Sequence, residues 1–424
     1  MTMPSRPSRP SRPSRSRGIP LLSGLPREVV VLAAIAFCVA LGFGIVAPAI
    51  PLFAKSFDVS TTAATSVIAV FALMRFVSSP FAGWLVNHIG ERVTLATGLG
   101  IVALSSALAG LASDFTHLLV LRGIGGIGSS MFTVSALALL LRVVGPEQRG
   151  RAAGAFQGGF LLGGVTGPAL GGLVTGISLR LPFFIYAATL TAALVVALVF
   201  LTGSHLRARE ATAGNLGRPS VTMGVALRDS AYRAALAANL ASGFAFFGLR
   251  SAIIPLFVVE ALQRGPEVTG YGLLVSAAVQ ALLLLPAGRI ADTRGRRPSM
   301  ILGATAASGA MLLLALTSST LLFLVAMAVF GVGSAFLGSA PSAVVGDITG
   351  GARGGIVVAA YQMCSDLGAV VGPITAGLII DATGSFALAF LVGTAAGLIG
   401  LVMALLMRET LPLITQRAAA AHEA

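Results

Sequence analysis

The sequence predicts an all-α polytopic membrane protein with twelve transmembrane helices in two six-helix, pseudo-symmetric halves. Three observations support this fold class. The 424-residue chain is 56% hydrophobic and only 10% charged, whereas soluble proteins carry about 25% charged residues. Long apolar runs recur along the chain, many of them long enough to cross a hydrocarbon layer of about 30 Å. The second half of the chain also repeats short patterns of the first.

The apolar runs fall into two groups of six, separated by a long polar interval. A basic segment precedes the first run, so a cleaved signal peptide is an alternative reading of that region. The run is long for a signal sequence and no convincing cleavage site follows it, which favours an uncleaved span. The predicted spans are 28–53, 62–86, 93–112, 116–141, 150–176, 181–202, 231–259, 269–289, 298–317, 320–345, 354–380 and 385–407.

The polar segments define the domain organisation. Ser-Arg-Pro repeats near the N-terminus cannot bury a core, so we expect that tail to be disordered. The predicted regions are a basic cytoplasmic tail at 1–27, an N-terminal half at 28–202, a cytoplasmic linker at 203–230, a C-terminal half at 231–407 and a cytoplasmic tail at 408–424.

The net charge of +13 is distributed as in a membrane protein. Of the 28 Lys and Arg residues, 22 fall in the tails and loops of one predicted side or at the span ends next to it. Cytoplasmic loops carry such an excess, so we expect a multi-pass plasma (inner) membrane protein with both termini in the cytoplasm. The basic tail is expected to contact anionic lipids, and the charge does not indicate a nucleic-acid partner. Cys38 and Cys364 lie inside spans and predict no disulfide.

A nearly constant offset of 205 residues relates the two halves. The segment "GWLVNHIGER" at 83–92 aligns with "GRIADTRGRR" at 288–297, and "GGIGSSM" at 125–131 aligns with "FGVGSAF" at 330–336. Six spans per half make this a parallel repeat, with an axis along the membrane normal. The duplication predicts a transporter whose halves rock about a site between them.

Both halves carry a loop motif after their second span. Its glycines allow a tight turn, its acidic or amide side chain can cap a helix, and its arginines favour the cytoplasmic side. The C-terminal copy is complete, whereas the N-terminal copy has Asn87 in place of Asp and Glu91 in place of a basic residue. The candidate gating residues are Gly288, Asp292, Gly295, Arg296 and Arg297 in one copy, and Gly83, Asn87, Gly90 and Arg92 in the other.

Two further motifs lie inside spans of the N-terminal half. Span 4 contains "RGIGGIGSS", beginning at Arg122. Span 5 contains the stretch "GGFLLGGVTGPALGG" at 158–172, and its glycines fit the pattern G-x8-G-x3-G-P-x2-G-G. The residues that fit this pattern are Gly154, Gly163, Gly167, Pro168, Gly171 and Gly172.

Together these motifs resemble the Major Facilitator Superfamily, and within it the twelve-span drug:proton antiporters. The resemblance covers about residues 28–407. It implies that the loop motif latches the halves in an outward-open state, although Asn87 and Glu91 put a charge-based latch in the N-terminal half in doubt. It also implies that Arg122 serves proton transfer or substrate binding, with structural pairing as the alternative. The span-5 pattern implies export.

The glycines of span 5 suit a helix in lipid. A repeated G-x-x-x-G face permits close approach between helices, and a proline is tolerated where neighbours satisfy the freed carbonyl. We therefore expect Gly163, Gly167 and Gly171 to form a contact surface between the rocking halves. Close packing without a directional role is the alternative.

Asp366 is the single acidic residue deep within a predicted span. It lies eleven residues from Gly355, and Arg75 lies eleven residues from Val86, so both are about 16 Å from the cytoplasmic side. An ionisable residue in a span usually has a function and a partner. The resemblance implies that spans 2 and 11 lie side by side where the halves meet, so we expect an Arg75–Asp366 ion pair that protonation weakens, with a permanent structural pair as the alternative.

The remaining candidates concern the substrate cavity. Arg122 and Arg250 lie nearer the external ends of spans 4 and 7, which the resemblance implies line the cavity. Two cavity arginines would suit an anionic or zwitterionic amphiphile better than a cationic drug. Structural pairing of Arg250 with backbone carbonyls is the alternative. The predicted cavity lining consists of Arg122, Arg250, Asn239, Phe43, Phe132, Phe246, Phe247 and Phe336.

Transport is the predicted activity: proton-coupled efflux of a small lipophilic or amphiphilic compound, a drug or a metabolite, by a monomer. Proton-coupled uptake and a non-transporting receptor are the alternatives. The sequence shows no P-loop for ATP, no metal-ligand spacing and no nucleophile–base pair. We therefore expect no catalytic residue, no metal and no cofactor.

Overall fold

The computed structural model describes residues 26–144, 149–201, 222–349 and 355–411. These residues form helices and no strand, and twelve of the helical segments are long and apolar enough to cross a membrane. This confirms the predicted fold class. The predicted tails and linker lie largely outside the described residues, but a short helix, α9 (Met223–Arg228), falls inside the predicted linker.

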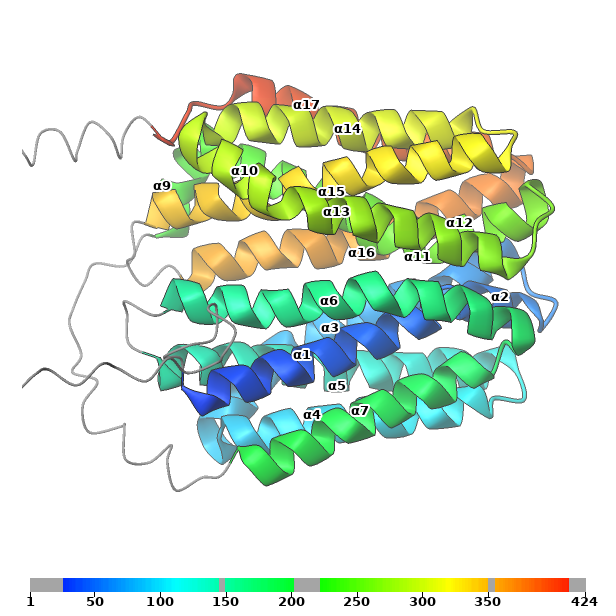
Figure 1. Cartoon of the computed structure of the whole chain (residues 1–424), viewed down its shortest axis with the longest axis horizontal. Coiled ribbons are helices and arrows are strands. Elements are labelled where there is room, and N and C mark those ends of the chain that lie inside the picture. The colour runs from blue at the N-terminus through cyan, green and yellow to red at the C-terminus, as the bar shows by residue number, and fades with distance from the viewer. Residues whose placement is uncertain (1–25, 145–148, 202–221, 350–354, 412–424) are drawn as a thin grey trace, which may run out of the picture.

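The N-terminal half places its six spans in seven helices (Figure 1). Span 1 is interrupted at Pro48, which separates its two helices, and the other spans are single helices. The bounds are α1 Arg27–Val46, α2 Ala49–Lys55, α3 Thr61–Ile89, α4 Glu91–Gly110, α5 Phe115–Val143, α6 Arg149–Ile177 and α7 Leu181–Phe200.

The C-terminal half has the same order, but its first span is broken into several pieces. Two of these pieces, η2 and η3, are π-helical, which the sequence analysis did not predict; π-helical turns are frequent at functional sites. The bounds are α10 Ser230–Ser242, η2 Gly243–Leu249, α11 Arg250–Ala252, α12 Ile254–Leu256, η3 Phe257–Ala261, α13 Pro266–Thr293, α14 Arg296–Ala315, α15 Thr320–Thr349, α16 Gly355–Thr383 and α17 Phe386–Leu406.

Local sequence sets the helix ends. Side chains of Ser60, Asp114 and Ser385 accept hydrogen bonds from backbone amides in the first turns of α3, α5 and α17, satisfying donors that a helix start leaves free. Gly90 and Gly295, which are 205 residues apart, have φ values of 86° and 117°. These left-handed turns connect α3 to α4 and α13 to α14, and glycine adopts them without steric cost.

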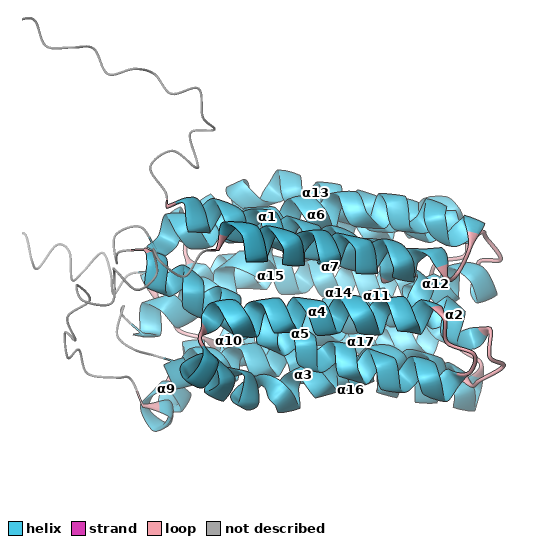
Figure 2. Cartoon of the chain, turned by 90° about the horizontal axis from the view of Figure 1, so that it is seen from below, coloured by secondary structure: helices cyan, strands magenta, loops and turns pink. Residues whose placement is uncertain are grey.

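The halves meet along two helix pairs: α3 packs against α16, and α6 packs against α13. The same pairs run side by side in Figure 2. The described chain starts and finishes at one end of the bundle, which we call the terminal end; the other is the far end. The two helix pairs therefore position whatever lies between the halves.

Candidate functional site

A cavity of about 50 Å³ lies between the halves. Helices α1, α2, α3 and α5 supply one wall, while η2, α11 and α16 supply the other. Its walls are mainly apolar and include two arginines. The lining residues are Phe43, Ala47, Ile50, Ile68, Phe71, Ala72, Arg75, Arg122, Phe247, Ser251 and Ala369.

Arg75 and Asp366 form an ion pair across the halves. Arg75 Nη2 donates to Asp366 Oδ1. The Asp366 side chain is 13% exposed and the Arg75 side chain 36% exposed. The pair expected from matching depths is therefore present, and it stands beside the cavity. Its role in proton coupling stays a prediction.

Arg122 lies in the cavity wall and is 2% exposed. Its guanidinium carbon lies 4.4 Å from the centre of the Phe71 ring, a cation–π distance. No hydrogen bond or ion pair joins Arg122 to another described residue, and its Nε is buried without a partner. The cavity thus contains one arginine that is paired and one that is not.

Two of the predicted aromatic residues, Phe43 and Phe247, line the cavity. The other predicted phenylalanines and Asn239 each pack inside the half to which they belong. Phe246 packs edge-to-face on Phe330, and Asn239 donates to the Tyr361 carbonyl at 2.5 Å. Phe132 and Phe336 are likewise buried, and Arg250 is partly buried outside the cavity lining.

Sequence reasoning missed most of the α3 wall. Ile68, Phe71, Ala72 and Arg75 all line the cavity, and their spacing of three and four residues places them on one helix face. Once Arg75 had been placed between the halves, this spacing could have identified the other residues on the same face of α3. Ser251, in the opposite wall, follows Arg250 directly and had no comparable signal.

Several contacts close the far end of the interface. The Asp381 carboxylate at the end of α16 accepts the Thr61 and Thr62 amides, both at 2.7 Å, at the start of α3. Thr65 Oγ1 donates to the Pro373 carbonyl at 2.9 Å. Between described residues, no hydrogen bond or ion pair joins the halves on the terminal side of the Arg75–Asp366 pair. The halves are therefore tied together at the far end.

The glycine face of span 5 has a different partner from the expected one. Ideal Cβ atoms on Gly163, Gly167 and Gly171 would lie 2.5–2.6 Å from backbone oxygens of α1, in the same half. Gly172 is the member that meets the other half: its Cβ would lie 2.5 Å from the Gly270 Cα on α13. The repeated face therefore holds one half together, because a G-x-x-x-G pattern marks close packing without naming the neighbour.

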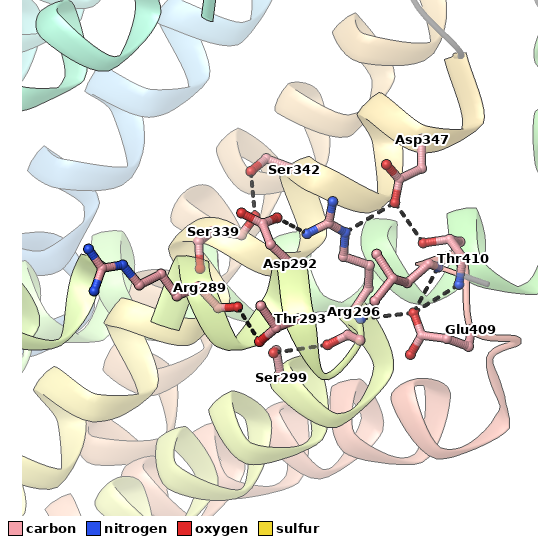
Figure 3. A network of polar contacts seen from close by, with 12 residues as sticks. Arg289, Asp292, Thr293, Arg296, Ser299, Ser339, Ser342, Asp347, Glu409 and Thr410 are labelled. Atoms are coloured by element: carbon pink, nitrogen blue, oxygen red, sulfur yellow. Dashed lines mark hydrogen bonds and ion pairs between the residues drawn. The ribbon is translucent and has the colours of Figure 1, made fainter. Parts of the chain in front are cut away.

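The complete loop motif forms a polar network within the C-terminal half (Figure 3). Arg296 lies between Asp292 and Asp347, donating from Nε to Asp347 Oδ2 at 3.1 Å. Glu409, beyond the last span, accepts the Arg296 and Arg297 amides at 2.8 and 2.9 Å and so caps α14. In this conformation the described contacts of these residues stay inside their own half.

The incomplete loop motif takes part in an ion pair that corresponds to the Arg296–Asp347 pair with the two charges exchanged. Arg142 Nη1 donates to Glu91 Oε2 at 2.7 Å. Glu91 stands 205 residues before Arg296, and Arg142 stands 205 residues before Asp347. The departure at Glu91 is thus matched by a basic residue on α5. Nothing is described of the Asn87 side chain.

The described residues contain no group of three or more His, Cys, Asp or Glu side chains that could hold a metal ion. Cys38 and Cys364 are free thiols.

Outside the spans, burial opposes ionisation of Asp229, but hydrogen bonds from Arg408 and the Ala231 amide outweigh it and lower the pKa of that carboxyl. This pair fastens the end of α17 to the start of α10.

Comparison with known proteins gives a consistent result. The family model described as Major Facilitator Superfamily matches residues 32–263 and 235–422. The chain is 28% identical over 174 residues to Multidrug resistance protein 2 of Bacillus subtilis (strain 168), covering 41% of this chain and 43% of that protein. It is 26% identical over 175 residues to Quinolone resistance protein NorA of Staphylococcus aureus, covering 41% and 45%. The matches thus span under half the length of these relatives.

Solved structures resemble the fold over nearly its whole length. A POT family transporter in complex with a thioalcohol-conjugated peptide superposes with a TM-score of 0.74 at 13% identity, covering 90% of this chain and 96% of that one. A bacterial homologue of the human lysosomal transporter Spinster gives 0.67 at 18% identity, covering 91% and 96%. At these identities the likeness concerns the fold alone.

Proposed function

The chain belongs to the Major Facilitator Superfamily of membrane transporters, and on that premise we propose that it exports a small lipophilic or amphiphilic molecule by proton-coupled alternating access. The observation that carries the proposal is the Arg75–Asp366 ion pair beside a cavity between the two halves. Ionisable residues inside a span are costly to bury and usually mark a functional site. Transporters built from two repeats bind their substrate between the repeats.

The contacts between the halves support alternating access. The far end is tied by the Asp381 carboxylate, and a second contact brings Lys55 Nζ within 3.8 Å of Glu260 Oε1. Ideal Cβ atoms at Gly83, Gly154 and Gly288, nearer the terminal end, would meet no atom within 4 Å. With basic loops placing the terminal end in the cytoplasm, this conformation faces inward, and transport requires the far-end contacts to break.

Export is supported by the span-5 glycine pattern and by the names of the two relatives, which describe resistance proteins. Proton coupling follows from the chemistry of the pair. Protonation of Asp366 removes the charge that holds Arg75, so the free energy of a contact between the halves depends on proton occupancy. The protein lies in the plasma membrane with its terminal end on the cytoplasmic side. The transporter acts as a monomer.

Efflux from a pump-deficient bacterial host tests this function. We expect cells expressing the chain to accumulate less of at least one lipophilic compound, and a protonophore to abolish the difference. Empty-vector cells are the control. Proteoliposomes with an imposed pH gradient then separate export from uptake by the direction of flux. A chain that moves no compound, or that ignores the collapsed gradient, contradicts the proposal.

A further inference from the structure

A buried charge without a partner is the most unusual feature of the cavity. Arg122 is 2% exposed, and its contact with the Phe71 ring leaves its donors without acceptors among the described residues. A guanidinium carries five N–H donors. Burying a charge without a partner costs several kcal/mol, so an arginine retained in this state indicates a missing acceptor.

The surroundings restrict what that acceptor is. The cavity wall contains two guanidinium groups, Arg75 and Arg122, and the neighbouring carboxylate of Asp366 is engaged by Arg75. The local charge therefore exceeds neutrality by one positive charge. An anion balances this charge, whereas a cation would add to it.

The rest of the wall is suited to an aromatic or otherwise planar apolar body. Phe43 and Phe71 come from one half and Phe247, which is 55% exposed, from the other. Ser251 adds one hydroxyl from the opposite wall, and no described residue forms a hydrogen bond with it. The cavity measures about 50 Å³ in this conformation, below the roughly 300–1,000 Å³ of drug-sized ligand sites, so binding of such a ligand requires the walls to move apart.

We infer that Arg122 is the anchor for the carboxylate, or an equivalent anionic group, of an aromatic amphiphile that occupies this cavity. The inference rests on the proposed function, since it names the substrate class of the same site. The guanidinium binds the anionic group, the phenylalanines contact the apolar body, and Ser251 brings the second half into contact with the ligand. Bidentate binding of a carboxylate is the geometry for which arginine is best suited.

A binding experiment on the purified full-length chain in nanodiscs of neutral lipid tests the inference without requiring transport. The probes are naphthalene-2-carboxylate and naphthalene-2-carboxamide, which share a ring system and differ in charge. We expect the wild type to prefer the carboxylate, and Arg122→Gln to lose about tenfold or more in affinity for it, as when one charge-assisted contact is removed. The carboxamide should bind both proteins alike.

Two further variants keep the result interpretable. Arg122→Lys retains the charge and should retain part of the preference. Arg180→Gln is the matched control, because Arg180 also lies over a phenylalanine ring, Phe53 at 5.2 Å, but is outside the cavity lining; it should bind the carboxylate like the wild type. Equal affinity of Arg122→Gln and wild type for the carboxylate, or no preference in the wild type, overturns the inference. Efflux in the host is measured separately, so the proposed function stands or fails independently.

Discussion

Arg75 of α3 donates to Asp366 of α16, and this ion pair joins the two halves of the molecule near the middle of both helices. Replacing Asp366 by Asn keeps the size and polarity of the side chain and removes its proton-dependent charge. We expect transport driven by a pH gradient in proteoliposomes to fall about tenfold or more, because the contact between halves no longer responds to protons. Substrate counterflow, which needs no gradient, should persist. An unchanged proton dependence in Asp366→Asn would refute the coupling role.

The two hydrogen bonds that Asp381 accepts from α3 predict a gate at the far end. Asp381→Asn removes the charge of this cap and should favour the conformation open at that end. Both proteins carry Ala in place of Cys38 and Cys364 and a reporter introduced as Ser251→Cys. An impermeant maleimide added outside cells should label this reporter about fivefold faster in the Asp381→Asn variant than in the protein that keeps Asp381. Asp58→Asn at the same end is the control, because the Asp58 side chain forms no hydrogen bond or ion pair with another described residue. Identical labelling rates in both variants would rule out the gate.

The exchanged ion pair between Glu91 and Arg142 predicts a rescue experiment. Glu91→Arg alone places two arginines together and should cost about 2 kcal/mol of stability, since one member of a partly buried pair is lost. Adding Arg142→Asp recreates the polarity found at Arg296 and Asp347 and should recover most of that loss. Thermal unfolding in detergent measures both. If the double variant is no more stable than the single one, the two pairs are not equivalent.

Two glycines of α6 with opposite surroundings test the packing of the N-terminal half. A Cβ on Gly167 would lie 2.6 Å from the Leu41 carbonyl oxygen, whereas one on Gly164 would meet no atom within 4 Å. Gly167→Ala should lower stability by about 2 kcal/mol through overpacking, while Gly164→Ala should leave it unchanged or slightly raised. The yield of monodisperse protein and its unfolding midpoint distinguish them. Equal behaviour would mean that α1 and α6 are not in this close contact.

The lowered pKa of Asp229 predicts a pH-dependent contribution from its pair with Arg408. A carboxyl whose folded-state pKa lies below its unfolded value stabilises the fold fully above about pH 4, and this contribution disappears as the pH falls through the folded-state value. The wild type should therefore exceed Asp229→Asn by up to about 1 kcal/mol at pH 7, and the gap should shrink in acid. Unfolding midpoints at pH 7, 5 and 3.5 check this; a gap of constant size would contradict it.

Hydropathy was sufficient to predict the twelve spans, because a membrane helix must be apolar over its length whatever its neighbours. Depth along the chain gave the matching level of Arg75 and Asp366, while the family resemblance implied that their spans are neighbours; opposite charges in adjacent helices at one depth attract. Hydropathy and depth can be read from each helix alone, but the adjacency of two helices cannot.

The cavity lining could not be predicted in the same way. Phe132, Phe246 and Phe336 each pack inside their own half, while Phe43 and Phe247 line the cavity, although all five lie in mainly apolar spans. A helix that is apolar on all sides carries no periodicity to separate lipid, neighbour and cavity. The glycine face of α6 failed for a related reason, since small residues reveal close contact but not which helix makes it.

The exchanged charges at the ends of α4 and α14 bear on how a duplicated protein can change. A single charge reversal at either position would leave two like charges in contact. The feature that the two halves share is therefore the ion pair and not the residues that form it. Chimaeras that transplant a loop from one half to the other should carry the partner on the neighbouring helix as well, or they will bring like charges together.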